Sequence, residues 1–178
     1  MKRVNVLNII LELIIVLGYV VIGMTCLTYI FQRATADRFF IGSIVGAIGV
    51  LQFAGFFTLK YAVRLKSIQS LVGAIIMIGL GVVFVVVNID EVLACILLGA
   101  FNIGLNIISI STCSINMSRQ PLLNSARTII DIISIVFSIF LLVKVTSFFY
   151  TYMTFVGIAL LVEAVVLLIE FIIHRYQN

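Results

Sequence analysis

The chain has 178 residues, of which 63% are apolar and only 10% are charged, and its formal net charge is +4. Soluble domains have about 25% charged residues, so this composition and the mean hydropathy of +1.33 exclude a soluble enzyme and a disordered chain. One Pro and three Cys exclude a disulfide scaffold. The sequence therefore predicts an integral membrane protein whose first partner is the lipid bilayer.

Six apolar stretches are long enough to cross a membrane. A helix rises about 1.5 Å per residue, so about 20 apolar residues span the hydrocarbon core of about 30 Å. The stretches are residues 8–31, 39–59, 68–87, 91–113, 127–145 and 148–173. No connector is long enough to fold by itself. We therefore predict an all-α fold, a polytopic bundle of six transmembrane helices that forms a single domain over residues 1–178.

The connectors carry residues that begin helices. Asp37, Ser67 and Asp90 precede the second, third and fourth stretches, and Asn124 follows Pro121 before the fifth. Each short polar side chain can accept hydrogen bonds from the free N–H groups of a helix start. The fifth helix is therefore expected to begin near residue 127.

The basic residues predict the orientation, because cytoplasmic loops carry an excess of Lys and Arg. One side of the predicted bundle holds Lys2, Arg3, Lys60, Arg64, Lys66, Arg119, Arg127 and Arg175. The other side holds only Arg33, Arg38 and Lys144. Both termini are therefore expected in the cytoplasm, in a multi-pass protein of the cell (cytoplasmic) membrane. Basic residues at helix ends do not form a nucleic-acid surface, so no nucleic acid is expected as a partner.

The six stretches form three hairpins, approximately residues 8–59, 68–113 and 127–173, whose second helices resemble one another. Each second helix has a Gly followed by a polar residue six or seven positions later. The pairs are Gly46 with Gln52, Gly99 with Asn106, and Gly157 with Glu163. A small residue allows close helix contact, and the polar residue lies about two turns further along. This spacing predicts an internal repeat.

The three short hairpins with Gly-punctuated second helices resemble the HdeD-like family of acid-resistance membrane proteins. The third hairpin carries the resemblance best, with IIDIISIVFSIFLL at residues 129–142 and TFVGIALLVEAVVLL at residues 154–168. The resemblance implies a three-hairpin membrane protein with a role in acid or envelope stress tolerance. This family has no agreed catalytic or binding residues, so the resemblance transfers no site.

Four acidic residues fall within the predicted spans, where an ionisable group costs about 2.5–3.5 kcal/mol to insert. Glu12 and Glu170 lie near the cytoplasmic ends and are expected to reach headgroups or water. Asp131 lies about one turn into the fifth helix, where Arg127 is a candidate partner, and Glu163 lies near the middle of the sixth.

Glu163 has no deep cation partner in this interpretation, because every Lys and Arg is assigned to a helix end or a connector. A carboxyl group without a cation in low dielectric takes up a proton. We therefore predict that Glu163 is neutral near pH 7 and donates a hydrogen bond to Asn102, Asn106 or Gln52. With Asp131, these four residues are the candidate intramembrane polar, proton-responsive site. The alternative is that they only fasten helices together.

Other features predict less. Gly42, Gly46 and Gly49 form a small-residue stripe that suits packing within the bundle or a dimer face. A single His and three scattered Cys match no metal-binding pattern, so no metal and no cofactor are expected. The polar residues include no nucleophile–base pair, and we expect no enzyme and no catalytic residues.

Three functions remain open. The first is a small membrane protein of the kind that the HdeD-like resemblance implies, active in acid or envelope stress tolerance. The second is a transporter or channel for a small solute or protons, which the intramembrane acids favour. The third is an accessory subunit of a larger membrane complex or a homo-oligomer, which the Gly stripe allows.

Overall fold

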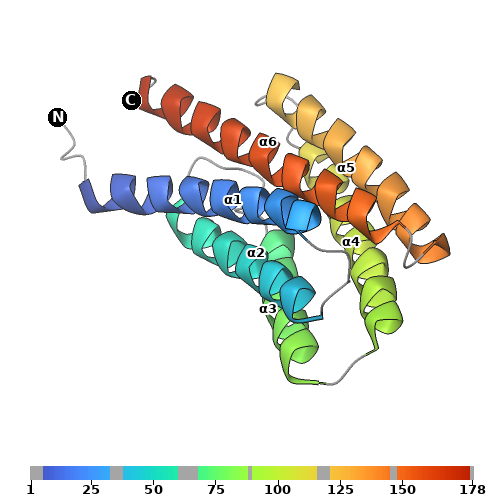
Figure 1. The fold of residues 1–178 in the computed structure, drawn as a ribbon. Coiled ribbons are helices and arrows are strands. Elements are labelled where there is room, and N and C mark those ends of the chain that lie inside the picture. Colours follow the sequence, from blue (N-terminus) through green and yellow to red (C-terminus); the bar gives the residue numbers. More distant parts are fainter. Residues whose placement is uncertain are drawn as a thin grey trace.

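The computed structural model describes residues 6–32, 38–59, 68–87, 90–115, 121–144 and 148–176, and the only regular secondary structure within these ranges is α-helix. The six helices are α1 (Val6–Gln32), α2 (Arg38–Thr58), α3 (Ile68–Val86), α4 (Glu91–Ile115), α5 (Pro121–Val143) and α6 (Phe149–Tyr176) (Figure 1). The predicted all-α class is confirmed, and each predicted stretch contains one helix.

Five of these helices are long and apolar enough to cross a membrane. In α3 the apolar helical stretch is shorter and covers Ser70–Val86. Many large apolar side chains point out of the bundle, such as Leu17 at 62% exposure and Ile129 at 58%. Exposure of these side chains to water would be unfavourable by about 25 cal/mol per Å² of apolar area. The bundle is therefore compatible with a multi-pass integral membrane protein.

The start of α5 differs from the prediction. The helix begins at Pro121, six residues before the expected start at Arg127. Proline suits the first turn of a helix, because its missing N–H would have no partner there. Asn124 is accordingly a buried helical residue whose carbonyl accepts a hydrogen bond from the Thr128 hydroxyl. The expectation that Asn124 precedes the helix is wrong.

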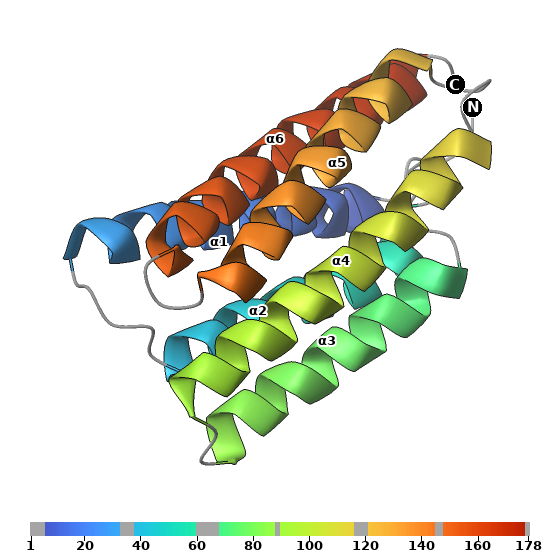
Figure 2. The same cartoon turned by 90° about the vertical axis from the view of Figure 1, so that its right-hand side faces the viewer.

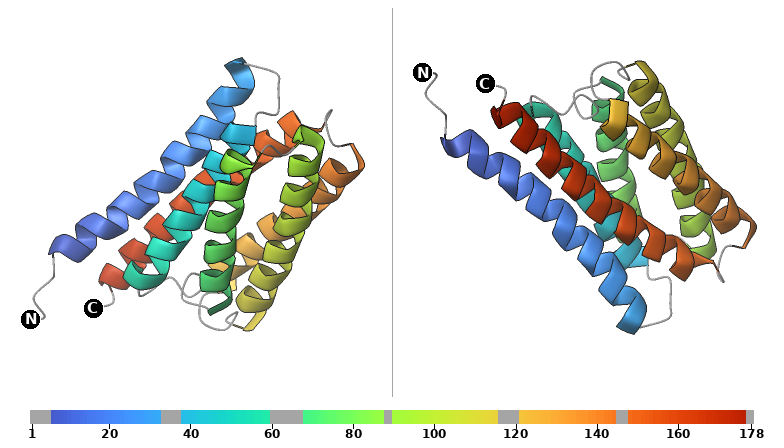
Figure 3. Two further views of the ribbon diagram at one scale, coloured as in Figure 1. Left: turned by 90° about the horizontal axis from the view of Figure 1, so that it is seen from below. Right: turned by 90° about the horizontal axis from the view of Figure 1, so that it is seen from above.

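The helices follow one another around a closed ring. Three pairs are in extensive contact, namely α2 with α3, α4 with α5, and α6 with α1 (Figure 2). The other neighbours in the ring, α1 with α2, α5 with α6, and α3 with α4, make fewer contacts, and α3 with α4 makes the fewest. The first turn of α1 and the last turn of α6 lie at the same end of the bundle (Figure 3).

Glycines make the tightest of these contacts possible. A Cβ atom on Gly81 of α3 would lie 2.6 Å from the Cα of Gly46 on α2, closer than real atoms approach. Between α1 and α6, a Cβ on Gly23 would lie 2.9 Å from the carbonyl oxygen of Gly157. Between α4 and α5, a Cβ on Gly99 would lie 3.2 Å from a methyl group of Leu142. Each extensively packed pair thus includes one of the glycines that the sequence spacing singled out.

The Gly stripe of α2 is covered by α3. Cβ atoms on Gly42 and Gly49 would each lie 2.8–2.9 Å from backbone atoms of that helix. The interpretation of the stripe as packing within the bundle is confirmed, and the alternative of a dimer face at these residues is wrong.

The contact between α2 and α3 can be tested with one methyl group. We expect Gly81→Ala to lower the free energy of unfolding by about 1–3 kcal/mol, because the backbones of the two helices must move apart. Gly79→Ala is the matched control on the same helix, since nothing lies within 4 Å of its Cβ position. The measurement is unfolding in mixed micelles titrated with dodecyl sulfate. Equal stability of the two variants would contradict the close contact.

Candidate functional site

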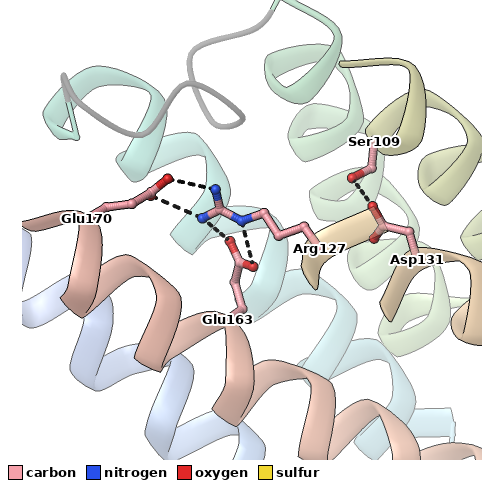
Figure 4. Close-up of polar contacts among 5 residues, drawn as sticks. All are labelled: Ser109, Arg127, Asp131, Glu163 and Glu170. Carbon is pink, nitrogen blue, oxygen red and sulfur yellow. Dashed lines mark hydrogen bonds and ion pairs between the residues drawn. The ribbon is translucent and has the colours of Figure 1, made fainter. Parts of the chain in front are cut away.

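A buried arginine joins the two helices of the last hairpin. The guanidinium of Arg127 on α5 lies between Glu163 and Glu170 on α6 (Figure 4). Its Nε and Nη2 donate to the two oxygens of Glu163 at 3.2 and 3.1 Å, and its Nη1 and Nη2 donate to the two oxygens of Glu170 at 2.8 and 3.1 Å. Two bidentate contacts of this kind use four of the five N–H donors of the planar guanidinium.

These contacts overturn two expectations. Glu163 has a cation partner, so the prediction of a neutral carboxyl group that donates to Asn102, Asn106 or Gln52 is wrong. Glu170 is only 1% exposed and does not reach headgroups or water. The cause is the early start of α5, which places Arg127 about 9 Å inside the helix at 1.5 Å per residue. Glu163 and Glu170 are two turns apart on α6 and therefore share a face toward it.

A second polar layer joins α4 to α5. The Asn102 Nδ2 donates to the hydroxyls of Ser134 and Ser138 at 2.9 and 2.8 Å, and the Asn106 Nδ2 donates to Ser134 at 3.0 Å. The polar sides of α4 and α5 thus meet inside the bundle. Such interhelical hydrogen bonds are worth about 0.6 kcal/mol each on average.

Asp131 lies in the same layer. Its carboxylate accepts a short hydrogen bond from the Ser109 hydroxyl of α4 (Figure 4). The side chain is 2% exposed. Asp131 therefore belongs to the interior of the bundle together with Asn102 and Asn106.

The ring of helices surrounds a partly open cavity of about 170 Å³. All six helices contribute to its lining. The five candidate residues from the sequence all line it, namely Gln52, Asn102, Asn106, Asp131 and Glu163. Further polar lining residues are Tyr19, Ser70, Ser109, Thr112 and Ser134. The structure therefore brings residues from α2, α4, α5 and α6 together around one polar space.

Sequence reasoning missed the roles of Arg127, Glu170 and Ser109 in this interior. The available signal was the helical spacing, since Arg127 shares a stripe with Asp131, and Glu163 shares one with Glu170. Arg127 was assigned to the first position of the fifth helix because the cap candidates Asn124 and Ser125 precede it. This assignment placed Arg127 at a helix end and not in the interior.

The charged residues of the described segments form no group of three or more His, Cys, Asp or Glu side chains that could hold a metal ion. Cys26, Cys95 and Cys113 are buried and form no disulfide with one another. The side chain of His174 lies outside the described part of the structure. The polar cavity is accordingly the feature of this bundle with the most chemical content.

Comparison of the chain with protein-family models, with curated proteins and with solved structures gives no match.

Removal of the Arg127 guanidinium tests how much the ion pairs to Glu163 and Glu170 stabilise the fold. We expect Arg127→Met to lower the free energy of unfolding by about 3–5 kcal/mol, because it leaves two carboxylates buried without their partner. The same substitution together with Glu163→Gln and Glu170→Gln should recover most of the loss.

Lys144→Met is the matched control, since Lys144 is exposed at the end of α5. Unfolding in dodecyl sulfate micelles again provides the measurement. An Arg127→Met variant as stable as Lys144→Met would show that the ion pairs contribute nothing to the fold.

Proposed function

We propose that this chain is a non-enzymatic, multi-pass protein of the cell membrane that binds a small polar solute inside its bundle, as a transporter or channel. The observation that carries the proposal is the polar cavity lined by all six helices. A membrane protein of this size keeps polar side chains away from lipid, and ionisable groups inside the membrane mark solute or proton pathways. A cavity also allows a solute to leave water without losing all of its hydrogen bonds.

The proposed topology has six crossings with both termini in the cytoplasm. Five helices meet the length and hydropathy of a span. The sixth, α3, has 19 residues and is about 28 Å long, close to the hydrocarbon thickness of about 30 Å. The excess of Lys and Arg on the side of the termini supports the orientation.

An internal threefold repeat and a role like that of the HdeD-like family form a second proposal. Gly46, Gly99 and Gly157 each contact the first helix of another hairpin. Their polar companions Gln52, Asn106 and Glu163 all line the cavity. The helix contacts follow the same pattern, since the extensive ones all join different hairpins. This regularity favours a three-hairpin repeat; acid or envelope stress tolerance rests on the resemblance alone.

Cysteine labelling tests both the lipid-facing surface and the cavity. We expect the thiol of Gln52→Cys to react with a charged methanethiosulfonate reagent when the protein is held in phosphatidylcholine nanodiscs, because a polar cavity of this size has room for water. Gln52 makes no side-chain hydrogen bond to the described residues, so its loss breaks no contact. The native thiols are buried and set the background.

The matched control is Val50→Cys, two residues away and 54% exposed on the outside of α2. Its thiol should stay unreactive toward the charged reagent in nanodiscs, because lipid covers it. A reactive Val50→Cys would contradict the membrane topology. An unreactive Gln52→Cys, in a protein that retains its fold, would contradict an accessible cavity.

A further inference from the structure

The hydrogen bonds around the cavity determine which way the Asn102 amide points. The hydroxyl of Ser138 donates its single proton to the backbone carbonyl of Ser134 at 2.8 Å. It can therefore only accept from Asn102, whose Nδ2 lies 2.8 Å away. The amide nitrogen of Asn102 thus faces α5, and its Oδ1 accepts no hydrogen bond from the described residues.

The Asn106 amide is oriented by the same reasoning. Its Nδ2 donates to the backbone carbonyl of Asn102 at 2.7 Å, and a carbonyl oxygen can only accept. The second N–H of the amide is used by Ser134. Asn106 is 7% exposed, and its Oδ1 accepts no hydrogen bond from the part of the chain that the structure describes. A buried acceptor without a donor is costly, by about 1–3 kcal/mol.

Among the other polar groups that line the cavity, the hydroxyl and amide groups of Tyr19, Gln52, Ser70 and Ser134 can donate and accept, and the carboxyl groups add acceptors and negative charge. Asp131 and Glu163 contribute carboxylates. The hydroxyl protons of Ser109 and Thr112 are committed to Asp131 and to the carbonyl of Ile108. Among the described residues, no Lys, Arg or His side chain lines the cavity. The ionisable interior cluster of Arg127, Asp131, Glu163 and Glu170 has one basic and three acidic members. The cavity is therefore rich in acceptors and suited to a cationic donor.

The size of the cavity indicates an organic cation. A single water needs about 10–15 Å³ of such space, and the cavity has about 170 Å³. A bare metal ion would leave most of this volume to water. The remaining lining is apolar and aromatic and includes Met77, Leu105 and Phe155. This surface suits a short hydrocarbon portion, and aromatic faces attract ammonium groups.

We propose that the cavity binds small primary ammonium compounds, with the ammonium N–H groups donating to Asn102, Asn106 and Asp131 and the hydrocarbon portion against Met77 and Phe155. An ammonium group has three donors and one positive charge, and the cavity offers acceptors and carboxylates. The inference rests on the proposed function, because it names the class of solute that the same cavity takes.

The test uses the full chain in phosphatidylcholine nanodiscs and n-butylammonium as the probe, with binding measured by isothermal titration calorimetry at pH 7 against empty nanodiscs. Three compounds of similar size separate the contributions: butan-1-ol lacks the charge, butyrate reverses it, and tetramethylammonium keeps it without N–H donors. We expect n-butylammonium to bind about tenfold or more tightly than each of the three, which is the effect of losing one charged hydrogen bond.

Two variants locate the binding. Asp131→Asn removes the charge but retains an oxygen that can accept from Ser109, and we expect about a tenfold weaker affinity for n-butylammonium. Glu12→Gln is the matched control, since it removes the same charge from a side chain of α1 outside the cavity lining. Its affinity should equal that of the unaltered chain. Gln52→Leu provides a second cavity variant that breaks no hydrogen bond of the described residues. It should also weaken binding, because it removes a further amide acceptor from the cavity lining.

Several outcomes would overturn the inference. Equal binding of tetramethylammonium would show that N–H donation plays no part. Equal binding of butan-1-ol would remove the cation requirement and leave a site for neutral solutes, so that the proposed function survives. No binding of any probe, while Gln52→Cys reacts with the charged reagent, would show an accessible cavity without affinity for ammonium. Equal losses in Asp131→Asn and Glu12→Gln would place the bound probe elsewhere.

Discussion

The buried guanidinium of Arg127 is the interaction on which the last hairpin depends. The α5–α6 contact is one of the less extensive contacts of the ring, and the ion pairs to Glu163 and Glu170 cross it. Charges that leave water lose several kcal/mol of hydration each, and only close bidentate partners compensate this loss. The alignment of the two helices is therefore constrained by charge neutralisation, together with the stacking of Phe137 on Phe155.

The extensive contacts of the ring depend on the close approach of helix backbones. Gly46 and Gly81 allow α2 and α3 to approach without side chains between their backbones, and Gly23 and Gly157 do the same for α1 and α6. Close backbone approach increases van der Waals contact, which has to replace the hydrophobic effect among helices in lipid. Because three pairs are close and three are less so, the ring retains space at its centre, and the polar members of the second helices line this space.

Much of this fold could be predicted from the sequence, because a helix that crosses the lipid needs an apolar segment of about 20 residues. Five helices lie within a few residues of their predicted limits. The candidate residues Asn102, Asn106 and Asp131 line the cavity of the bundle. The start of α5 was missed because Pro121, Asn124 and Arg127 have the composition of a connector, whereas in the bundle the polar members turn inward. The partner of Glu163 could not be found, since it depends on how α5 and α6 are aligned, and spacing within a single helix does not contain this alignment.

The unequal contacts around the ring have a mechanical consequence. Three helix pairs act as rigid units, namely α2 with α3, α4 with α5, and α6 with α1. Sliding one helix of a pair along the other would separate closely packed glycine backbones or break the hydrogen bonds between amide and hydroxyl groups. Conformational change is therefore concentrated at the three less extensive contacts, α1 with α2, α3 with α4, and α5 with α6. The contact between α5 and α6 is held by the ion pairs of Arg127. The contact between α3 and α4 is the least extensive and the easiest to separate. Separation of α3 from α4 would enlarge the cavity while the extensively packed helix pairs move as rigid bodies.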